Sequence, residues 1–184
     1  MGLPPGQVEA KRWVTYAALG FPKVDLGSWR LEVCGLVERR LSLSYSDLLS
    51  MPQVGVRGGL HCVEGWSVSS VEWEGVRIRD LAEAAGVKPE ARWLMFWSIE
   101  GYSAPVYLED ALAEDSIIAL KLNGERLSYE HGFPARPIIP RVYAWKSVKW
   151  LKRLEFLRDY VDGYWEKRGY HERGRVWVEE RRKK

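Results

Sequence analysis

The sequence predicts a single α+β domain in which mixed β-sheets are accompanied by short helices. Its 184 residues are enough for one domain with a substantial core and too few for two. The apolar runs are short, mixed in type and separated by turn residues, which is typical of this class. Nothing resembles a βαβ dinucleotide unit, since the chain has no Gly-x-Gly-x-x-Gly and no phosphate-binding P-loop.

We expect residues 1–28, which are rich in Gly and Pro, to form an irregular arm packed on a domain of residues 29–184. Residues 29–37 alternate like a half-buried strand, and Cys34 within it is interpreted as a small buried hydrophobic residue. After this strand, Ser46 is expected to cap a short helix from Asp47 to Ser50, which Pro52 stops.

The next elements are shorter. A strand-like stretch, residues 54–59, opens into glycines and places Cys62 at a strand end or on a loop. Gly86 is expected to close a helix, and Asn123-Gly124 is a strong tight-turn signal after a strand. The further elements are expected as strands over 70–73, 92–97 and 117–122, a helix over 79–85, and a strand or short helix over 148–157. Prolines at 134, 137 and 140 punctuate a loop-and-strand segment.

Charge and hydropathy limit the functional classes. The net charge is only +3, so no nucleic-acid partner is expected. From Glu166 onward, however, eight Lys or Arg residues stand against four Glu, which favours a solvated, frayed terminus over an RNA or membrane contact. No apolar run is long enough to span a membrane, and the N-terminus lacks the apolar stretch of a signal peptide. We therefore expect a cytoplasmic protein without a structural disulfide.

Cys62 lies in the stretch Gly-Leu-His-Cys-Val-Glu-Gly-Trp and has several possible roles. Zinc is a poor fit, because three histidines and two cysteines are scattered and His61 directly adjoins Cys62. A thiol enzyme would need Cys62 near His131 or His171, and no local signature supports that arrangement. From these residues alone, Cys62 is either an inert core thiol, a nucleophile or a metal ligand.

A second group of residues runs from His131 to Phe156, where basic side chains and a hydroxyl alternate with prolines and aromatics. Arginine offers a two-pronged fork and lysine a point charge, so such a group suits a phosphate-bearing ligand. A solvated basic strand edge is the alternative, and it accounts well for Lys152 and Arg153. The group comprises His131, Arg136, Arg141, Lys146, Ser147 and Lys149.

Six segments together carry a specific resemblance. In order they read WRLEVCGLV, HCVEGW, WEGVRIRDL, LNGERLSYEHGFPARPIIP, WKSVKWLKRLEF and GYWEKRGYHERG. Over nearly the whole chain this resembles the molybdopterin-binding domain of the sulfite oxidase family, as a short standalone member. The resemblance implies that family's fold and a molybdopterin cofactor.

The resemblance also implies roles for individual residues. Cys62 matches the cysteine whose thiolate binds molybdenum, a soft ligand that the metal itself would deprotonate. His131 and Arg136 match the pair that holds the pterin and its phosphate, in a His-Gly-x-Pro-x-Arg motif. Tyr170 matches the active-site tyrosine beside the metal oxo group.

Further residues are implied to contact the same cofactor. Ser147, Val148 and Lys149 match the Ser-x-Lys segment that closes around it, with Val148 acting through its backbone. Ser98 or Glu100 falls where some family members contact the cofactor.

The sequence departs from sulfite oxidases just after the cysteine. Those enzymes place an arginine there to bind the sulfite dianion, whereas this chain has Val63-Glu64-Gly65-Trp66, which is similar to the run in the periplasmic methionine-sulfoxide reductase catalytic subunit. Arg141 or Arg168 could supply the charge from another direction.

The implied function is molybdenum-dependent oxygen-atom transfer to or from a small sulfoxide- or sulfite-like substrate. Because the chain has no haem motif and no iron–sulfur cysteine set, electrons would pass through a separate electron-transfer protein. The alternatives are a cofactor-free binding or scaffold protein that retains the fold, and an RNA-associated protein with a basic tail.

Overall fold

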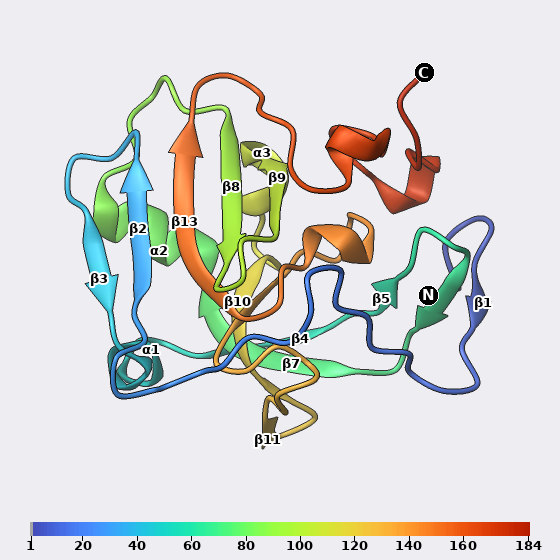
Figure 1. The fold of residues 1–184 in the computed structure, drawn as a ribbon, viewed down its shortest axis with the longest axis horizontal. Helices are drawn as coiled ribbons and strands as arrows, with labels where there is room; N and C mark the ends of the chain where they lie inside the picture. Colours follow the sequence, from blue (N-terminus) through green and yellow to red (C-terminus); the bar gives the residue numbers. More distant parts are fainter. Residues whose placement is uncertain (1) are drawn as a thin grey trace.

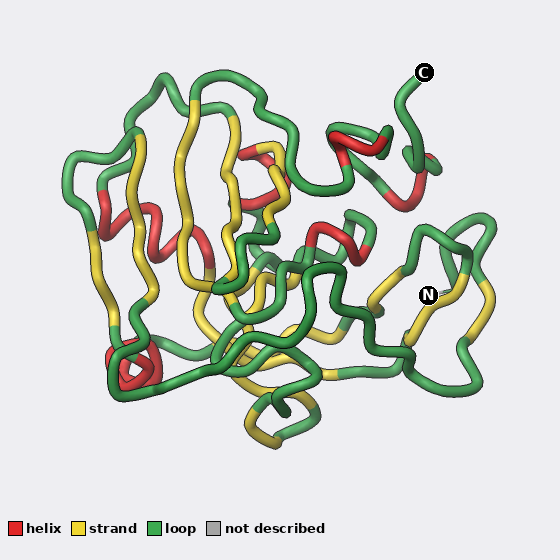
Figure 2. The backbone as a smooth tube through the Cα atoms, viewed as in Figure 1, coloured by secondary structure: helices red, strands yellow, loops and turns green. Residues whose placement is uncertain are grey.

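The computed structural model describes residues 2–184 and contains three β-sheets with a few short helices (Figures 1 and 2). The strands are β1 Val8–Glu9, β2 Leu31–Gly35, β3 Leu41–Leu43, β4 Val54–Arg57, β5 Leu60–His61, β6 Trp66–Val68, β7 Glu72–Arg77, β8 Trp93–Ser98, β9 Ser103–Tyr107, β10 Ile117–Leu122, β11 Glu125–Arg126, β12 Arg136–Ile138 and β13 Leu151–Leu157. The helices are α1 Tyr45–Ser50, α2 Ile78–Ala85 and α3 Leu108–Ala111, with 3-10 turns η1 Ala144–Lys146, η2 Glu166–Arg168 and η3 Val176–Val178.

The first sheet has the strand order β3-β2-β13-β8-β9 and holds the main core. Strands β2 and β13 are parallel, whereas the other neighbours are antiparallel. Helix α2 lies behind this sheet in Figure 1 and buries Ile78, Leu81, Ala82 and Ala85. These residues recur at helical spacing, so they form the apolar stripe that packs against the sheet.

The second sheet is antiparallel, with the order β11-β10-β7-β4 and β12 added beside β10. Gly75 in β7 permits the close approach of β10, since a Cβ there would lie 2.0 Å from the carbonyl oxygen of Ile118. Strand β12 starts with Arg136, which this pairing carries into the interior of the molecule, where the side chain is 3% exposed.

The third sheet is small and has the order β1-β6-β5. Strand β1 belongs to the N-terminal arm and pairs in parallel with β6, Val8 opposite Trp66. In Figure 1 the rest of the arm, drawn in blue, crosses the molecule without regular structure to reach β2. Because β5 ends at His61, this sheet fixes the start of the turn that carries Cys62.

The predicted fold class is confirmed, and several local predictions hold. Strand 117–122 is β10, and it is followed by Asn123 at φ 50° and Gly124 at φ 81°, which form the predicted tight turn. Gly86 closes α2 in a left-handed conformation at φ 67°. Cys34 is buried in β2, and Cys62 directly follows a strand, as expected. In the segment 148–157, for which a strand and a helix were both open, Leu151–Leu157 form strand β13.

Two boundaries predicted from the sequence are wrong. Helix α1 is capped by Ser44 rather than Ser46, because Ser44 Oγ accepts from the Asp47 N–H at 3.1 Å and the Asp47 carboxylate accepts from the Ser44 N–H at 2.8 Å. This reciprocal capping box starts the helix two residues earlier than predicted. The strand expected over 70–73 begins at Glu72 and continues to Arg77, since pairing with β10 extends it.

Both cysteines are free thiols. Within residues 2–184, none of the helices combines the length and apolar character needed to cross a bilayer.

Candidate active site

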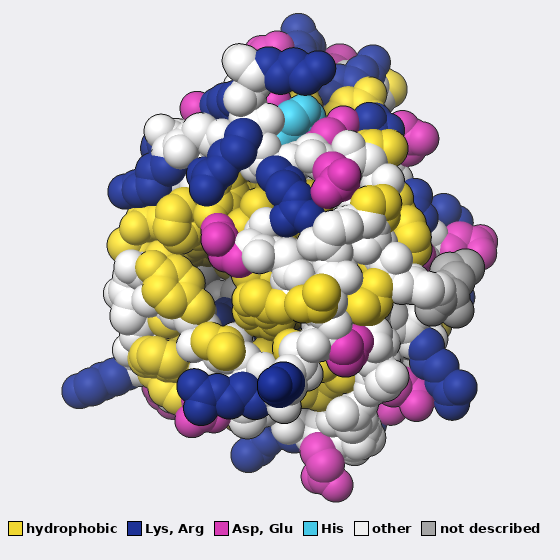
Figure 3. Space-filling view, turned by 90° about the vertical axis from the view of Figure 1, so that its right-hand side faces the viewer, with side chains coloured by type: hydrophobic (Ala, Val, Ile, Leu, Met, Phe, Trp, Pro, Cys, Tyr) yellow, Lys and Arg dark blue, Asp and Glu magenta, His cyan; other side chains and the backbone are white. Residues whose placement is uncertain are grey.

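One cavity of about 440 Å³ collects residues from distant parts of the sequence. Residues 13–18 of the arm cover it, and the turn after β5, the start of β12 and the segment between η1 and β13 form its walls. Figure 3 shows a hollow on this side of the molecule that hydrophobic side chains surround, with Lys and Arg side chains above and below. Of the residues predicted for the site, the following line the cavity: Cys62, His131, Arg136, Ser147, Lys149 and Tyr170.

Cys62 lies in a tight turn at one end of this cavity. Its N–H donates to the carbonyl oxygen of Trp66 at 2.8 Å, and the Gly65 N–H donates back to its carbonyl oxygen at 3.1 Å. Burial raises the pKa of the Cys62 thiol, and the nearby backbone N–H of Glu64 acts in the opposite direction. The free thiol is therefore protonated at neutral pH, and a bound cation would be needed to hold it as thiolate.

A buried basic cluster forms another part of the wall. The Arg136 guanidinium donates to Ser147 Oγ at 3.0 Å and to the carbonyl oxygens of His131 and Ser147 at 2.9 and 3.3 Å. Burial lowers its pKa to about 9, and no carboxylate within the described residues lies within ion-pair distance of it. Burial, followed by repulsion from Arg136, lowers the pKa of Lys149 to about 8.

His131 completes this basic cluster. Burial lowers the pKa of its ring, and the charges of Arg136 and Lys149 lower it further. Its Nδ1 atom is buried and has no hydrogen-bond partner among residues 2–184. A buried polar atom of this kind is costly unless a partner arrives, so the cluster is suited to an anionic, hydrogen-bonding ligand.

Tyr170 lies in an aromatic cluster beside Cys62. Its ring stacks on Trp165 with ring centroids 4.9 Å apart and meets the edge of Trp145, also at 4.9 Å. Burial raises the pKa of Tyr170, and the nearby Glu64 and Cys62 act in the same direction. The hydroxyl therefore stays protonated at neutral pH and can donate a hydrogen bond into the cavity.

A buried ion pair holds this aromatic cluster in place. Lys146 Nζ donates to Glu166 Oε1 at 2.7 Å, and both side chains are fully buried. Glu166 Oε1 also accepts from Trp145 Nε1 at 2.7 Å, while Lys146 donates to the carbonyl oxygens of Pro105 and Glu172. Desolvation lowers the pKa of Lys146, and the Glu166 carboxylate opposes that shift. The pair thus ties η1 to the segment that carries Tyr170.

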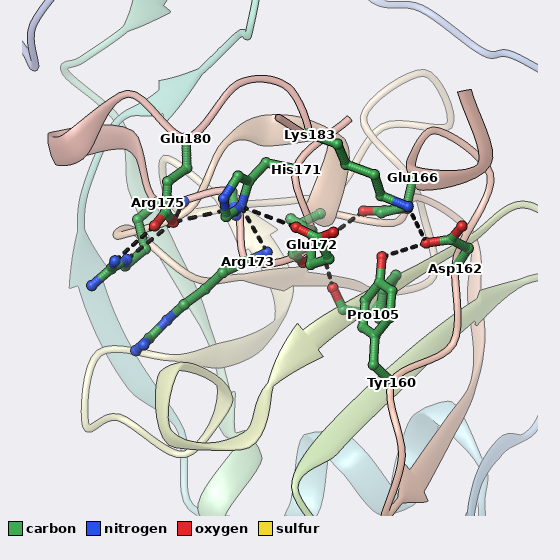
Figure 4. A network of polar contacts seen from close by, with 12 residues as sticks. Pro105, Tyr160, Asp162, Glu166, His171, Glu172, Arg173, Arg175, Glu180 and Lys183 are labelled. Atoms are coloured by element: carbon green, nitrogen blue, oxygen red, sulfur yellow. Dashed lines mark hydrogen bonds and ion pairs between the residues drawn. The ribbon is translucent and has the colours of Figure 1, made fainter. Parts of the chain in front are cut away.

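The basic C-terminal segment is ordered, so the expectation of a frayed terminus is wrong. Lys183 Nζ contacts Asp162 at 2.6 Å, and Figure 4 shows Lys183 and Tyr160 both directed at this carboxylate. The Arg182 guanidinium lies 4.2 Å from the Tyr170 ring centroid, and Arg181 donates to the carbonyl oxygen of Val63 in the Cys62 turn. These ion-pair and cation–π contacts join the C-terminal segment to residues far away in the sequence. The local charge of the segment, on which the expectation was based, does not reveal them.

Two of the predicted cofactor contacts do not line the cavity. Val148 is fully buried in the main core, and its N–H donates to the carbonyl oxygen of Lys146 at 3.1 Å. Ser98 is buried behind Glu100, to whose carboxylate its hydroxyl donates, and Glu100 itself lines the wall. Of the two alternatives at this position, Glu100 is the one that the structure brings to the cavity.

The arginines considered as substitutes for the missing cation lie elsewhere. Arg141 pairs with Asp115 at 3.0 Å in a different groove, and Arg168 lies 3.8 Å from the Tyr164 ring centroid outside the cavity lining. Sequence reasoning missed Glu64, which lines the cavity beside Cys62, and Arg181. Glu64 lies two residues after the cysteine in the motif and could have been singled out, whereas Arg181 had no local signal.

Comparison with known proteins decides the family. The model of the oxidoreductase molybdopterin-binding domain matches residues 18–165, well over half of the chain. The chain belongs to this family. It is a molybdenum-dependent oxidoreductase of the sulfite oxidase type, and the cofactor of the family is molybdopterin.

Several relatives in this family are similar over most of the chain. An uncharacterized oxidoreductase, YuiH of Bacillus subtilis, is 43% identical over 85% of this chain and 79% of its own length. Gallus gallus sulfite oxidase is 31% identical over 91% of this chain and 44% of its own length. The catalytic subunit MsrP of the Campylobacter jejuni protein-methionine-sulfoxide reductase is 26% identical over 76% of this chain and 52% of its own length. The chain thus spans about half the length of the last two.

The solved structure of the sulfane dehydrogenase SoxCD from Paracoccus pantotrophus shares the fold. The two structures match with a TM-score of 0.72 and 24% sequence identity. The match covers 86% of this chain and 47% of the SoxCD chain. The sulfite-oxidase-type fold expected from the sequence is thereby confirmed.

The residues of the cavity fit the cofactor of the family. The buried His131 Nδ1 without a partner and the Arg136 guanidinium without a carboxylate suit the pterin and its phosphate. Gly132 lies so close to Lys149 that a Cβ on it would be 2.9 Å from the lysine Cβ, so the absence of a side chain allows the two parts of this cradle to approach each other. Cys62 supplies a soft sulfur ligand, and no group of three or more His, Cys, Asp or Glu side chains within residues 2–184 could hold a metal alone. A metal at Cys62 would take its other ligands from the cofactor.

Proposed function

We propose that the protein transfers an oxygen atom to or from a small neutral substrate of the sulfoxide type, and that it exchanges electrons through a separate protein. The observation that carries this proposal is the wall around Cys62 and Tyr170. It presents tryptophan rings and the Glu64 carboxylate to the cavity, and its two basic residues, Arg136 and Lys149, belong to the cofactor cradle.

The charges near Cys62 disfavour a dianion such as sulfite. Glu64 lies near both Cys62 and Tyr170, since it raises the pKa of each. Two guanidinium groups lie nearby, but neither lines the cavity. Arg181 donates to the carbonyl oxygen of Val63, and Arg182, over the Tyr170 ring, is solvent-exposed and its charge is screened. A missing charged hydrogen bond costs about 1.5–3 kcal/mol, or roughly ten- to a hundredfold in binding.

The residues of the chain have distinct parts in this reaction. A bound molybdopterin supplies two-electron redox chemistry and the site of oxygen-atom exchange. His131, Arg136, Ser147 and Lys149 bind and orient it, and Tyr170 donates its hydroxyl hydrogen to the substrate oxygen. Reduction of a sulfoxide consumes two electrons and two protons and yields a thioether and water. Residues 13–18 and the aromatic rings limit the access of bulk water to the site.

The electron partner is proposed on two grounds. The chain contains neither a haem motif nor a cysteine set for an iron–sulfur cluster, and the relative from Campylobacter jejuni is named as a catalytic subunit.

The test compares two substrates on metal-replete protein, made in a host that synthesises molybdopterin. Sulfite is assayed with a dye acceptor and a sulfoxide with a dye donor, and we expect sulfoxide reduction to be the efficient reaction. Fast sulfite oxidation without sulfoxide reduction would overturn the proposed substrate class. Elemental analysis comes first: purified protein free of molybdenum and pterin would favour a cofactor-free binding protein.

A further inference from the structure

The arm carries an exposed apolar patch beside the cavity that contains Cys62. Exposed hydrophobic side chains mark interaction sites when they gather in one place. Phe21 of the arm lies against Tyr129 and Trp150, with ring centroids 5.9 and 5.2 Å apart, so the apolar surface continues from the arm onto the domain. We call the following residues, all at least 37% exposed, the arm patch: Val14, Tyr16, Leu19, Phe21 and Tyr129.

The arm around this patch carries only positive charge. Between Glu9 and Asp25 it has three exposed cations and no acidic residue. Figure 3 shows Lys and Arg side chains above and below the hydrophobic side chains that surround the hollow. The cavity lining contains the carboxylates of three Glu residues, so the uniform sign is a property of the arm. The three cations of the arm are Lys11, Arg12 and Lys23.

Aromatic rings connect the arm patch to the proposed reaction site. Tyr170, which lines the same cavity as Cys62, stacks on Trp165 with ring centroids 4.9 Å apart. The Trp165 ring in turn lies 6.4 Å from the ring of Tyr16 in the patch. Residues 13–18 also line the cavity, so a protein bound to the arm lies directly over it. Because electron transfer slows steeply with distance, this face offers a short route to the site.

We propose that the arm patch is the docking surface for the electron partner, and that this partner is a one-electron carrier protein with an acidic face. Carboxylates on such a face complement Lys11, Arg12 and Lys23, while the apolar centre of the patch supplies contact area. Redox encounters bury less surface than stable complexes do, so a local patch is enough. This inference rests on the proposed exchange of electrons through a separate protein.

The electron balance requires two docking events in each turnover. Two molecules of the reduced carrier each lose one electron, two protons come from solvent, and the sulfoxide becomes a thioether and water. The oxidised carrier must leave before the next reduced one binds. Repeated exchange of this kind favours electrostatic steering, which speeds association, over a large apolar interface, which slows release.

The first experiment maps docking on the full-length protein and does not depend on turnover. The probe is an acidic iron–sulfur ferredoxin, treated with a carbodiimide that joins lysine amines to carboxylates in direct contact. We expect cross-links at Lys11 and Lys23 by mass spectrometry, and their loss at high salt. Lys88 is the internal control, since it is exposed but lies beyond the end of β2, where its N–H donates to the carbonyl oxygen of Leu36.

The second experiment measures sulfoxide reduction by the molybdenum-loaded protein with reduced ferredoxin as donor. Combining Lys11→Glu, Arg12→Glu and Lys23→Glu should lower kcat/KM for ferredoxin at least about tenfold, equivalent to about 1.4 kcal/mol. Added salt should lower the wild-type value and raise that of the variant, because it screens attraction in one and repulsion in the other. The rate with an uncharged dye donor should be the same in both, since these residues lie outside the cavity lining.

Two further variants separate the contributions of charge and apolar surface. The matched control combines Arg40→Glu, Lys88→Glu and Arg158→Glu, three exposed positions beyond the ends of β2, α2 and β13. It changes the net charge equally and should keep the ferredoxin rate. Leu19→Asp alters an exposed patch residue outside the cavity lining and should raise KM for ferredoxin while the dye rate is retained.

Equal loss of ferredoxin-driven activity in the arm and control variants would overturn the inference. So would cross-links that avoid Lys11 and Lys23, or a ferredoxin that neither cross-links nor donates electrons. Binding of anionic lipid vesicles in place of ferredoxin would assign the patch to a membrane surface instead. The dye assay distinguishes the two proposals: no dye-driven sulfoxide reduction refutes the proposed function, whereas dye activity with a ferredoxin rate that ignores the arm charges refutes the docking surface alone.

Discussion

Among the side chains of the cavity, Cys62 is the residue on which the proposed chemistry depends most. It is the cysteine that lines the cavity, whereas Cys34 is buried in β2 and 4% exposed. The two thiols thus form a natural pair for comparison, since one faces the site and the other faces the core.

Replacing Cys62 by Ser should abolish activity and most of the thiolate-to-metal absorption, while the fold survives. A hydroxyl is a harder and less acidic ligand than a thiol, so it does not replace the sulfur. Circular dichroism and the visible spectrum of the loaded protein check both parts. Cys34→Ser is the control and should cost about 1–3 kcal/mol of stability through a buried hydroxyl, with activity retained. Equal loss of activity in both variants would indicate a packing effect instead.

Removing a charge from the basic cluster should lower cofactor occupancy. In Arg136→Ala and Lys149→Ala a buried phosphate would lack a charge-assisted partner, a cost of about 2–5 kcal/mol at such a site. Pterin and molybdenum content per purified chain is the measurement. Arg153→Ala, at an exposed position on β13, is the matched control and should load normally. Normal pterin content in both cluster variants would place the cradle elsewhere.

The same cluster predicts an unusual pH dependence for the cofactor-free protein. The pKa of Lys149 is about 8 in the folded chain against an ordinary value of 10.5, so between these pH values the unfolded chain binds more protons. Stability therefore rises with pH in this window as the half-buried lysine loses its charge. Melting temperatures from pH 7 to 10 should show this rise in the wild type, and Lys149→Met should lack that contribution. Identical pH profiles for the two proteins would contradict the assignment of the charge to Lys149.

At the scale of elements, the Lys146–Glu166 pair joins η1 to η2 behind the aromatic cluster. Tyr102 strengthens this connection, because its hydroxyl donates to the carbonyl oxygen of Trp145 at 2.6 Å. The two 3-10 turns are too short to be stable alone, so their position depends on such tertiary contacts.

Breaking this pair should be costly, and removing both charges much less so. Lys146→Met leaves the buried Glu166 carboxylate without its partner and should destabilise the protein by about 3–5 kcal/mol. Adding Glu166→Gln, which keeps an oxygen for Trp145 Nε1, should recover a large part of that loss. Urea unfolding of the single and double variants measures the difference. The exposed Arg57–Glu72 pair, 3.9 Å apart, is the control, and Arg57→Ala should cost at most about 1 kcal/mol. A double variant as unstable as the single one would refute the role of the unpaired charge.

For the whole molecule, the predictions that hold rest on local signals. The Asn123-Gly124 turn, Gly86 at the end of α2 and the position of Cys62 after a strand are each encoded within a few neighbouring residues. The resemblance of the six ordered segments to the family supplied the prediction of the site. Six of the residues predicted in this way line one cavity.

What the sequence did not reveal depends on contacts between distant segments. The cap of α1 is the exception, because Ser44 and Asp47 lie three residues apart and their reciprocal hydrogen bonds are a local signal. Val148 matches the motif, yet core packing turns it away from the cavity. Arg181 meets Val63 across 118 residues, a contact that neither periodicity nor charge pattern indicates.

The contact between Arg181 and the Cys62 turn has a consequence for the order of biosynthesis. During translation the turn leaves the ribosome long before residue 181 does, so a nascent chain has the Cys62 turn without its contact to Arg181. Molybdopterin that arrived at that stage would meet an unfinished pocket. The cavity wall is thus complete only when residues 170–183 have been made and have folded back onto the domain.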